Sequence, residues 1–158
     1  MSYSNFQKAT ELAKKCQYYK TAGQQTEELI SKVENVYGFK ISSQHYEYYI
    51  KYGYIMFFGT EFFGIYKDVF DGIYASNAVI ATLDREQFNL PKEWIPLFDY
   101  DDGYIAYLDY AHLNSDNEPR VILAIYTGKE YEVTDVIADD LGDFLLELVQ
   151  EQLEAQNN

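Results

Sequence analysis

The stretch Trp94–Tyr110, W-I-P-L-F-D-Y-D-D-G-Y-I-A-Y-L-D-Y, carries the clearest indication of the fold in this chain. Two aromatic-rich runs with alternating apolar residues flank the dipeptide Asp102-Gly103. Asp-Gly between such runs is typical of a β-hairpin, because a type I′ turn needs positive φ at both central residues. The stretch therefore predicts two paired strands at the centre of a sheet, joined by a turn at Asp102-Gly103.

Carboxylates crowd this turn, at Asp99, Asp101 and Asp102. The run resembles a calcium-binding loop in part, but Gly103 stands fifth in it rather than sixth and no Glu occupies the twelfth place. Paired carboxylates could act as acid and base if burial separated their pKa values, but at the tip of a hairpin we expect them to be solvated. We therefore expect no metal site, no cofactor and no catalytic residue here.

Helical patterns dominate the chain before residue 53. Thr26 and either Ser42 or Ser43 suit N-caps, because their side-chain oxygens can accept from the free N–H groups of a first helical turn. Gly38 and Gly53 should end these two helices in the same left-handed conformation. An earlier helix is predicted over residues 3–20 from apolar residues at three- and four-residue steps.

Strand patterns follow residue 53, and the chain closes on another helix. Helices first, then strands, then a helix predict an α+β fold of one domain, with helices packed on a mainly antiparallel twisted sheet. Pro96 should stand at an edge or at the first position of a strand. The other predicted elements are strands over 54–58, 61–66, 120–126 and 130–133, a loop over 67–76, a helix over 77–88, and a final helix capped by Asp139 or Asp140.

The net charge of −14 is concentrated in one part of the chain. Residues 1–60 have a balance of +2, whereas residues 61–158 have a balance of −16. Nucleic-acid binding depends on neutralising phosphates, so we expect no direct binding of nucleic acid. A basic protein partner fits better, and some of the 17 Tyr and 10 Phe rings could line its binding surface. Alternatively, the acidity serves solubility and the rings serve the core.

Cysteine, histidine and apolar segments bound the remaining possibilities. Cys16 is the only cysteine, which excludes an intramolecular disulfide. No apolar run resembles a secretory signal or a membrane span, so a cytoplasmic protein is expected. His45 and His112 lack a second ligand at metal spacing and a nucleophile signature, so no enzyme is expected. A histidine in a pocket within ~3.2 Å of a nucleophile or carboxylate would favour the enzyme alternative.

Three segments together resemble the SUKH superfamily of Smi/Knr-type domains, and within it the YobK-like bacterial immunity proteins. Gly38–Gly53, G-F-K-I-S-S-Q-H-Y-E-Y-Y-I-K-Y-G, resembles the pattern Gly-hydrophobic-Leu-Pro-x-x-Tyr-x-x-Phe-Leu-x-x-Tyr-Gly, with Ser42 in place of Pro. Tyr107–Asp109 in the hairpin resembles Cys-Leu-Asp. Glu118–Ile122 and Ile137–Leu141 resemble the Pro-Val-hydrophobic strand and the Ala-x-Ser-Phe helix start of the family.

This resemblance implies a single domain over residues 1–158. Its parts would be an N-terminal helix and link over 1–23, a family-like region over 24–150, and a helix end with a frayed tail over 151–158. It also implies an immunity protein that neutralises a polymorphic toxin, many such toxins being nucleases. The alternative is an intracellular scaffold or regulatory module without a toxin partner. The expected partner-binding residues are Asp99, Tyr100, Asp101, Asp102, Tyr104 and, on weaker grounds, Glu61.

Overall fold

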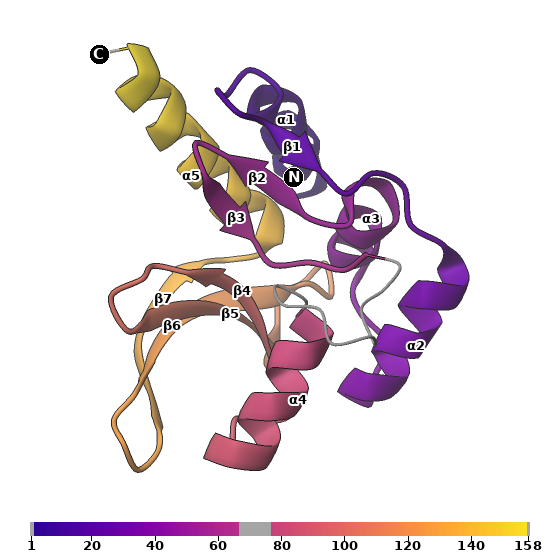
Figure 1. The fold of residues 1–158 in the computed structure, drawn as a ribbon, viewed down its shortest axis with the longest axis vertical. Helices are drawn as coiled ribbons and strands as arrows, with labels where there is room; N and C mark the ends of the chain where they lie inside the picture. Colours follow the sequence, from indigo (N-terminus) through magenta and orange to yellow (C-terminus); the bar gives the residue numbers. More distant parts are fainter. Residues whose placement is uncertain (1, 67–76, 158) are drawn as a thin grey trace.

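The computed structural model describes residues 2–66 and 77–157. The loop expected over residues 67–76 lies outside them. The described residues form a seven-stranded antiparallel sheet in which each strand pairs with its neighbours in chain order (Figure 1). The strands are β1 (Lys20–Thr21), β2 (Ile55–Phe57), β3 (Thr60–Phe62), β4 (Trp94–Asp99), β5 (Tyr104–Leu113), β6 (Pro119–Tyr126) and β7 (Tyr131–Ala138).

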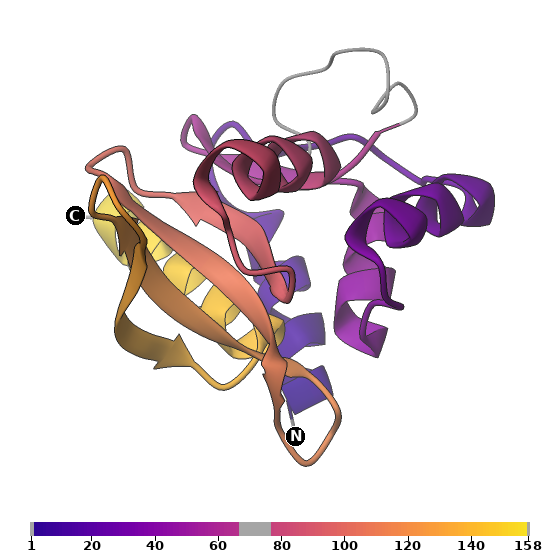
Figure 2. The ribbon, with the colours of Figure 1, turned by 90° about the horizontal axis from the view of Figure 1, so that it is seen from below.

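The predicted hairpin is the pair β4–β5, and β4 is the middle strand of the sheet. The helices are α1 (Ser2–Ala13), α2 (Glu27–Tyr37), α3 (Ser43–Tyr52), α4 (Asn77–Phe88) and α5 (Leu141–Asn157). Helices α1 and α5 lie side by side, while α2 lies next to α4 (Figures 1 and 2). The α+β fold with helices on an antiparallel sheet is thereby confirmed, and it includes the helix predicted over residues 77–88.

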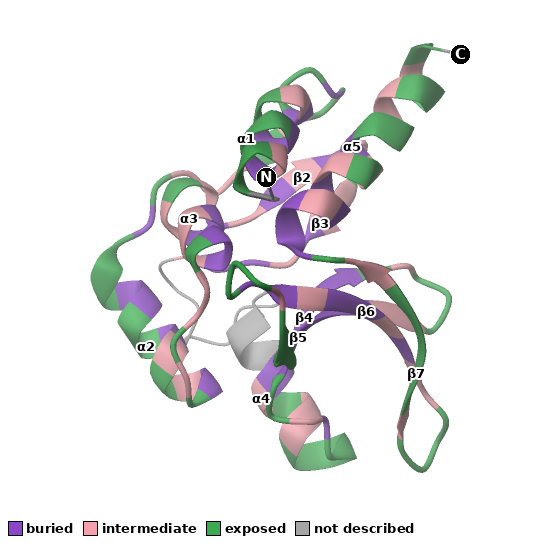
Figure 3. Ribbon diagram, turned by 180° about the vertical axis from the view of Figure 1, so that it is seen from behind, coloured by how far each residue is buried: buried purple, intermediate pink, exposed green. Residues whose placement is uncertain are grey.

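The two faces of the sheet bury different clusters of side chains. Successive residues of a strand point to opposite faces, and Ala106 and Leu108 of β5 join the main core, which includes Phe144 of α5. Tyr107 joins a smaller cluster with Trp94 on the other face. At the edge of the sheet, β7 leaves most of its residues exposed (Figure 3).

Capping residues begin the helices where the sequence predicts. Thr26 Oγ1 accepts from Leu29 N at 3.1 Å and begins α2. Ser42 Oγ accepts from His45 N at 3.4 Å and begins α3. Gly38 ends α2 at φ 90° and ψ 10°, in the expected left-handed conformation. These signals are reliable because a cap satisfies N–H or C=O groups within a few residues of itself.

Gly53 ends α3 differently, which corrects the expectation that it would repeat the geometry of Gly38. It has φ 69° and ψ −65°, and Tyr54 N donates to Tyr52 O at 2.7 Å. These values describe a γ-turn centred on Gly53, a tighter reversal than a left-handed helix cap. The turn directs the chain from α3 straight into the strand pair β2–β3.

The first predicted helix extends too far, because α1 ends at Ala13 rather than at residue 20. Lys15 N and Cys16 N donate three residues back, to Leu12 O and Ala13 O, and so close the helix. The chain then turns and Lys20–Thr21 pairs with β2 as strand β1. Pairing with a distant strand overrides the local helical pattern here.

Two expectations about the strands are also corrected. Pro96 is an interior residue of the central strand β4, neither at an edge nor first, and the register shifts between Pro96 and Phe98. A bulge tolerates proline because its missing N–H then breaks no ladder hydrogen bond. The last strand continues five residues past Val133 to Ala138, because its pairing with β6 persists to Val121. None of the helices in residues 2–66 and 77–157 has the length and apolar character needed to span a bilayer.

Candidate functional site

The tip of the β4–β5 hairpin contains five of the six residues that the sequence singles out. Tyr100 N donates to Tyr104 O at 3.1 Å, and this bond closes a loop of three residues. Asp101 and Gly103 have φ values of 62° and 96°, whereas Asp102 has no positive φ. The predicted two-residue type I′ turn at Asp102-Gly103 is therefore wrong. The tip is a longer loop with left-handed residues at its first and last positions.

The carboxylates explain why this longer loop forms. Asp99 Oδ1 accepts from Asp101 N at 2.8 Å, and Asp102 Oδ1 accepts from Tyr104 N at 3.0 Å. Such bonds from an Asp side chain to the backbone two residues on compete with a tight hairpin turn. Asp99, Asp101 and Asp102 are all exposed. One oxygen of Asp99 and of Asp102 thus stabilises the loop while the charge faces solvent.

Tyr100 leaves the tip toward α5. Its ring packs edge-to-face on Phe98 with centroids 4.9 Å apart. Burial raises the pKa of Tyr100 to about 12, and the charges of Glu151, Glu147 and Asp102 contribute. It lines a groove of about 420 Å³ between β7 and α5. Tyr104 pairs with Ile125 in the ladder and is half-buried.

Glu61 lies outside the β4–β5 hairpin, although the next residue, Phe62, pairs with Phe98 just before the tip. It is a half-buried residue of β3, opposite Met56 in the ladder, and it lines a separate hollow with Lys20, Tyr54 and Tyr66. Burial raises the pKa of Glu61, and the charge of Lys20 opposes that shift. The structure therefore groups the five hairpin residues and places Glu61 in another hollow.

The sequence does not predict a second hollow that lies beside the tip. It lies between α4 and the face of β5–β7 that bears Tyr107, and it measures about 230 Å³. Gly103 at the tip forms part of its wall. We call it the aromatic hollow; it is lined by Asp84, Phe88, Gly103, Ile105, Tyr107, Ala124, Tyr126 and Tyr131.

His45 is a packed core residue. Its Nδ1 lies 2.6 Å from the hydroxyl of Tyr110, and only 1% of its surface is exposed. Its ring stacks near Tyr37 and meets Tyr49 edge-to-face at 4.3 Å. Burial lowers the pKa of His45 to about 3. This histidine is neutral and serves the core.

His112 has a carboxylate partner, which the sequence did not indicate. Its Nδ1 lies 2.9 Å from Asp109 Oδ2, within the distance set for the enzyme alternative. Arg120 Nε donates to the same oxygen at 2.9 Å, and Ala111 N donates to the other at 3.1 Å. Within the described residues no hydroxyl or thiol is hydrogen-bonded to His112. The couple thus lacks a nucleophile, and Asp109 serves mainly as the buried partner of Arg120.

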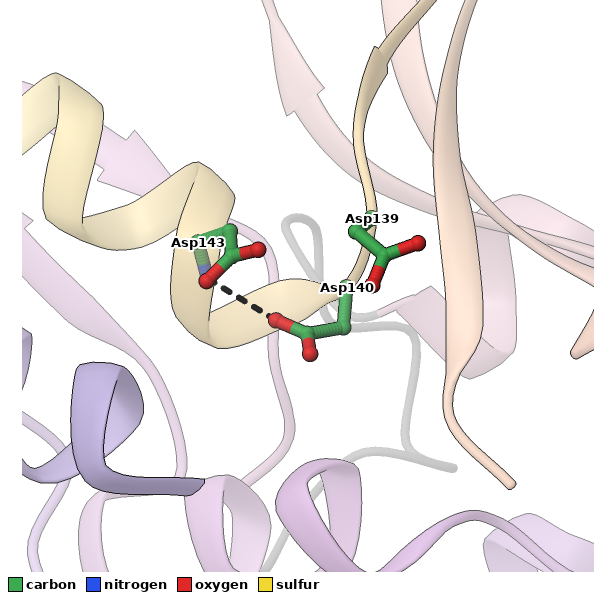
Figure 4. A group of neighbouring side chains, drawn as sticks. All are labelled: Asp139, Asp140 and Asp143. Carbon is green, nitrogen blue, oxygen red and sulfur yellow. Dashed lines mark hydrogen bonds between the residues drawn. The ribbon is translucent and has the colours of Figure 1, made fainter. Parts of the chain in front are cut away.

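Asp139, Asp140 and Asp143 form an acidic group in which one ligand atom from each lies within 4.8 Å of the others (Figure 4). Asp140 Oδ1 accepts from Asp143 N at 2.9 Å, so Asp140 is the predicted N-cap of α5. Asn114 Nδ2 donates to Asp139 at 3.2 Å and Asn5 Nδ2 donates to Asp143 at 2.7 Å. Carboxylates at a helix N-terminus are stabilised by its N–H groups and dipole. The group is therefore accounted for as a helix start.

Comparison with known proteins adds one finding. A model of the SMI1/KNR4 family (SUKH-1) matches residues 25–147, from the start of α2 into α5. No curated protein matches the chain. The matched residues include the hairpin tip and the aromatic hollow, and they confirm the resemblance to the SUKH superfamily.

Proposed function

Since the chain belongs to the SMI1/KNR4 family (SUKH-1), we propose that it is an immunity protein that binds and neutralises a basic toxin domain in the cytosol. The family is known for immunity and antitoxin-like proteins and is generally not enzymatic. We propose a nuclease domain as this basic partner, and the YobK-like motifs support an immunity role. The proposed binding surface is the tip of the β4–β5 hairpin.

The observation that carries this proposal is the uncompensated charge at the tip. Residues 61–158 have a balance of −16. In the described part of the chain, the ion pairs formed by lysines all lie within residues 1–60. The ion pairs of Asp109 lie at the end of the hairpin away from its tip. No basic side chain of the described residues pairs with Asp99, Asp101 or Asp102.

Exposed charges of one sign attract an oppositely charged partner and raise its association rate. A nuclease must attract phosphates, so its active face is basic. An acidic hairpin flanked by Tyr100 and Tyr104 can occupy such a face, and tyrosines supply much of the binding energy in many interfaces. The protein would thus act by competing with nucleic acid for the active face of the toxin.

We expect the triple variant Asp99→Asn, Asp101→Asn, Asp102→Asn to weaken partner binding about 10-fold at low salt, since three exposed pairs contribute about 0.5 kcal/mol each. Asparagine keeps the side-chain oxygens that hold the loop and tolerates the left-handed conformation at residue 101. The measurement is quantitative capture of the partner from the native cell by each chain, followed by titration with the identified partner at low and high salt.

The matched control is Glu27→Gln, Glu93→Gln, Asp116→Asn, which removes three exposed charges away from the tip. Unchanged affinity and salt dependence in the hairpin variant would remove the tip from the binding surface. Failure of the wild-type chain to protect cells that express a captured protein would favour the scaffold or regulatory alternative. A captured toxin that is neutralised supports the immunity role.

A further inference from the structure

The aromatic hollow is a concavity lined mainly by aromatic rings, and Asp84 is the one charged residue among the described residues that line it. It is formed where α4 covers part of the sheet face opposite α5. Its volume of about 230 Å³ is large enough for one long side chain and too small for a folded segment. Gly103 of the hairpin tip is one of its lining residues, so the hollow adjoins the tip.

The rings are arranged edge-to-face around the hollow. Phe88 meets Tyr126 with centroids 5.1 Å apart, Tyr126 meets Tyr131 at 5.0 Å, and Tyr107 meets Tyr131 at 6.2 Å. In an edge-to-face pair, the ring that presents its edge keeps both of its faces free of its partner ring. The face of an aromatic ring carries negative potential and attracts cations. Phe88 is 39% exposed, so part of this wall is open to solvent.

Asp84 adds a formal negative charge to the aromatic wall. Burial raises the pKa of Asp84, because its charge is partly removed from water. The same charge contributes, after burial, to the raised pKa values of Tyr107 and Tyr131, and all three residues line the hollow. No basic group in the described residues lies within ion-pair distance of this carboxylate.

The neighbouring cation does not compensate Asp84. Arg85 follows it in α4, but its guanidinium donates to the carbonyls of Val36 and Tyr37 at 3.2 and 3.1 Å and to that of Lys92. Arg85 is thereby committed to joining α4 to α2. Among the described residues, Asp84 is therefore a partly desolvated carboxylate in an aromatic hollow, and no counterion pairs with it.

We propose that the aromatic hollow binds the cationic side chain of an arginine or lysine that projects from the protein partner. The inference rests on the proposed function for its partner and deepens it by naming what that partner inserts. Both components of the hollow favour a cation, since ring faces attract it and Asp84 forms an ion pair with it. The adjoining acidic tip receives the basic residues that flank the inserted side chain.

The test titrates the isotope-labelled chain with N-acetyl-L-arginine methylamide and N-acetyl-L-lysine methylamide and follows backbone NMR signals. N-acetyl-L-citrulline methylamide is the neutral control for arginine. We expect the cationic probes to shift signals of Asp84, Phe88, Ile105, Tyr126 and Tyr131, and citrulline to bind at least about 5-fold more weakly. Equal shifts with citrulline, or shifts confined to other surfaces, would overturn the inference.

Asp84→Asn should weaken binding of the arginine probe at least about 5-fold, and Tyr126→Leu should weaken it as well. The control Asp116→Asn removes an equal charge from the turn between β5 and β6 and should leave binding unchanged. The unperturbed remainder of each spectrum establishes that the variants fold. Equal weakening by Asp84→Asn and Asp116→Asn would indicate general electrostatics and would contradict a specific site.

These experiments separate failure of the inference from failure of the proposed function. The probe titration needs no partner, so specific arginine binding supports the hollow even when no toxin is neutralised. Conversely, a neutralised toxin that binds wild type and Asp84→Asn with equal affinity overturns the hollow as its anchor while the immunity role stands.

Discussion

Replacing Gly64 by alanine should destabilise the fold by about 3 kcal/mol or more, the upper range for overpacking a buried site. A Cβ at Gly64 would overlap the carbonyl oxygen of Gly53 and lie 2.9 Å from the Cα of Tyr54. Both obstacles are backbone, which cannot move aside as a flexible side chain can. Gly64 itself has no positive φ, so the expected loss arises from the clash alone.

The clash is severe because three segments cross at this point. Ile65 N donates to Gly53 O at 2.8 Å, and Ala22 N donates to Tyr52 O at 3.0 Å. The carbonyls of Tyr52 and Gly53 in the γ-turn thus accept hydrogen bonds from the chain after β1 and from the chain after β3. Separating Gly53 from Gly64 would break the first of these bonds and disturb the end of α3.

Chemical denaturation measures this loss, and Gly59→Ala is the matched control. Gly59 has φ 75° with nothing within 4 Å of an added Cβ, so its replacement should cost only the strain of a left-handed alanine, about 1–2 kcal/mol. Complete loss of the folded state in Gly64→Ala would agree with the expectation. A Gly64→Ala variant as stable as Gly59→Ala would show that the crossing yields, contrary to the argument.

Predictions succeeded where the cause is local. Thr26, Ser42 and Asp140 act on N–H groups three residues away, so the sequence around them suffices to place a helix start. The end of α1 was missed because pairing of β1 with β2 joins Lys20–Thr21 to residues more than thirty positions later. No local pattern contains that contact.

The candidate site shows the same division. The hairpin tip was predicted because alternation and turn residues lie within one stretch, although the exact turn depends on competing bonds from Asp99 and Asp102. The aromatic hollow was missed because it needs α4 to settle on the sheet. Asp84 and Tyr131 line the same hollow only because of that packing, and the residues next to each in the sequence give no sign of it.

Acidification from pH 7 to pH 5 should cost wild type about 2 kcal/mol of stability through His45 alone. The pKa of His45 is lowered by burial to about 3 in the folded protein, against about 6.5 in the unfolded chain. Below pH 6.5 the unfolded chain therefore binds a proton that the folded protein excludes. The stabilisation is complete above pH 6.5 and is lost progressively as pH falls toward 3.

His45→Phe isolates this contribution. Phenylalanine keeps a ring against Tyr37, Tyr49 and Tyr110 and cannot titrate, although it loses the 2.6 Å contact with the hydroxyl of Tyr110. That loss changes stability by a similar amount at every pH, whereas the proton effect grows on acidification. Other groups titrate alike in both proteins. One of them is Glu118: burial raises its pKa, so its contribution to stability increases on acidification, opposite to that of His45.

Denaturant unfolding at pH 7, 6 and 5 should show the difference in stability between the two proteins shifting by about 2 kcal/mol in favour of the variant. Parallel stability curves would mean that His45 binds its proton as readily in the folded protein as in the unfolded chain. That result would contradict a core histidine that stays neutral at pH 5.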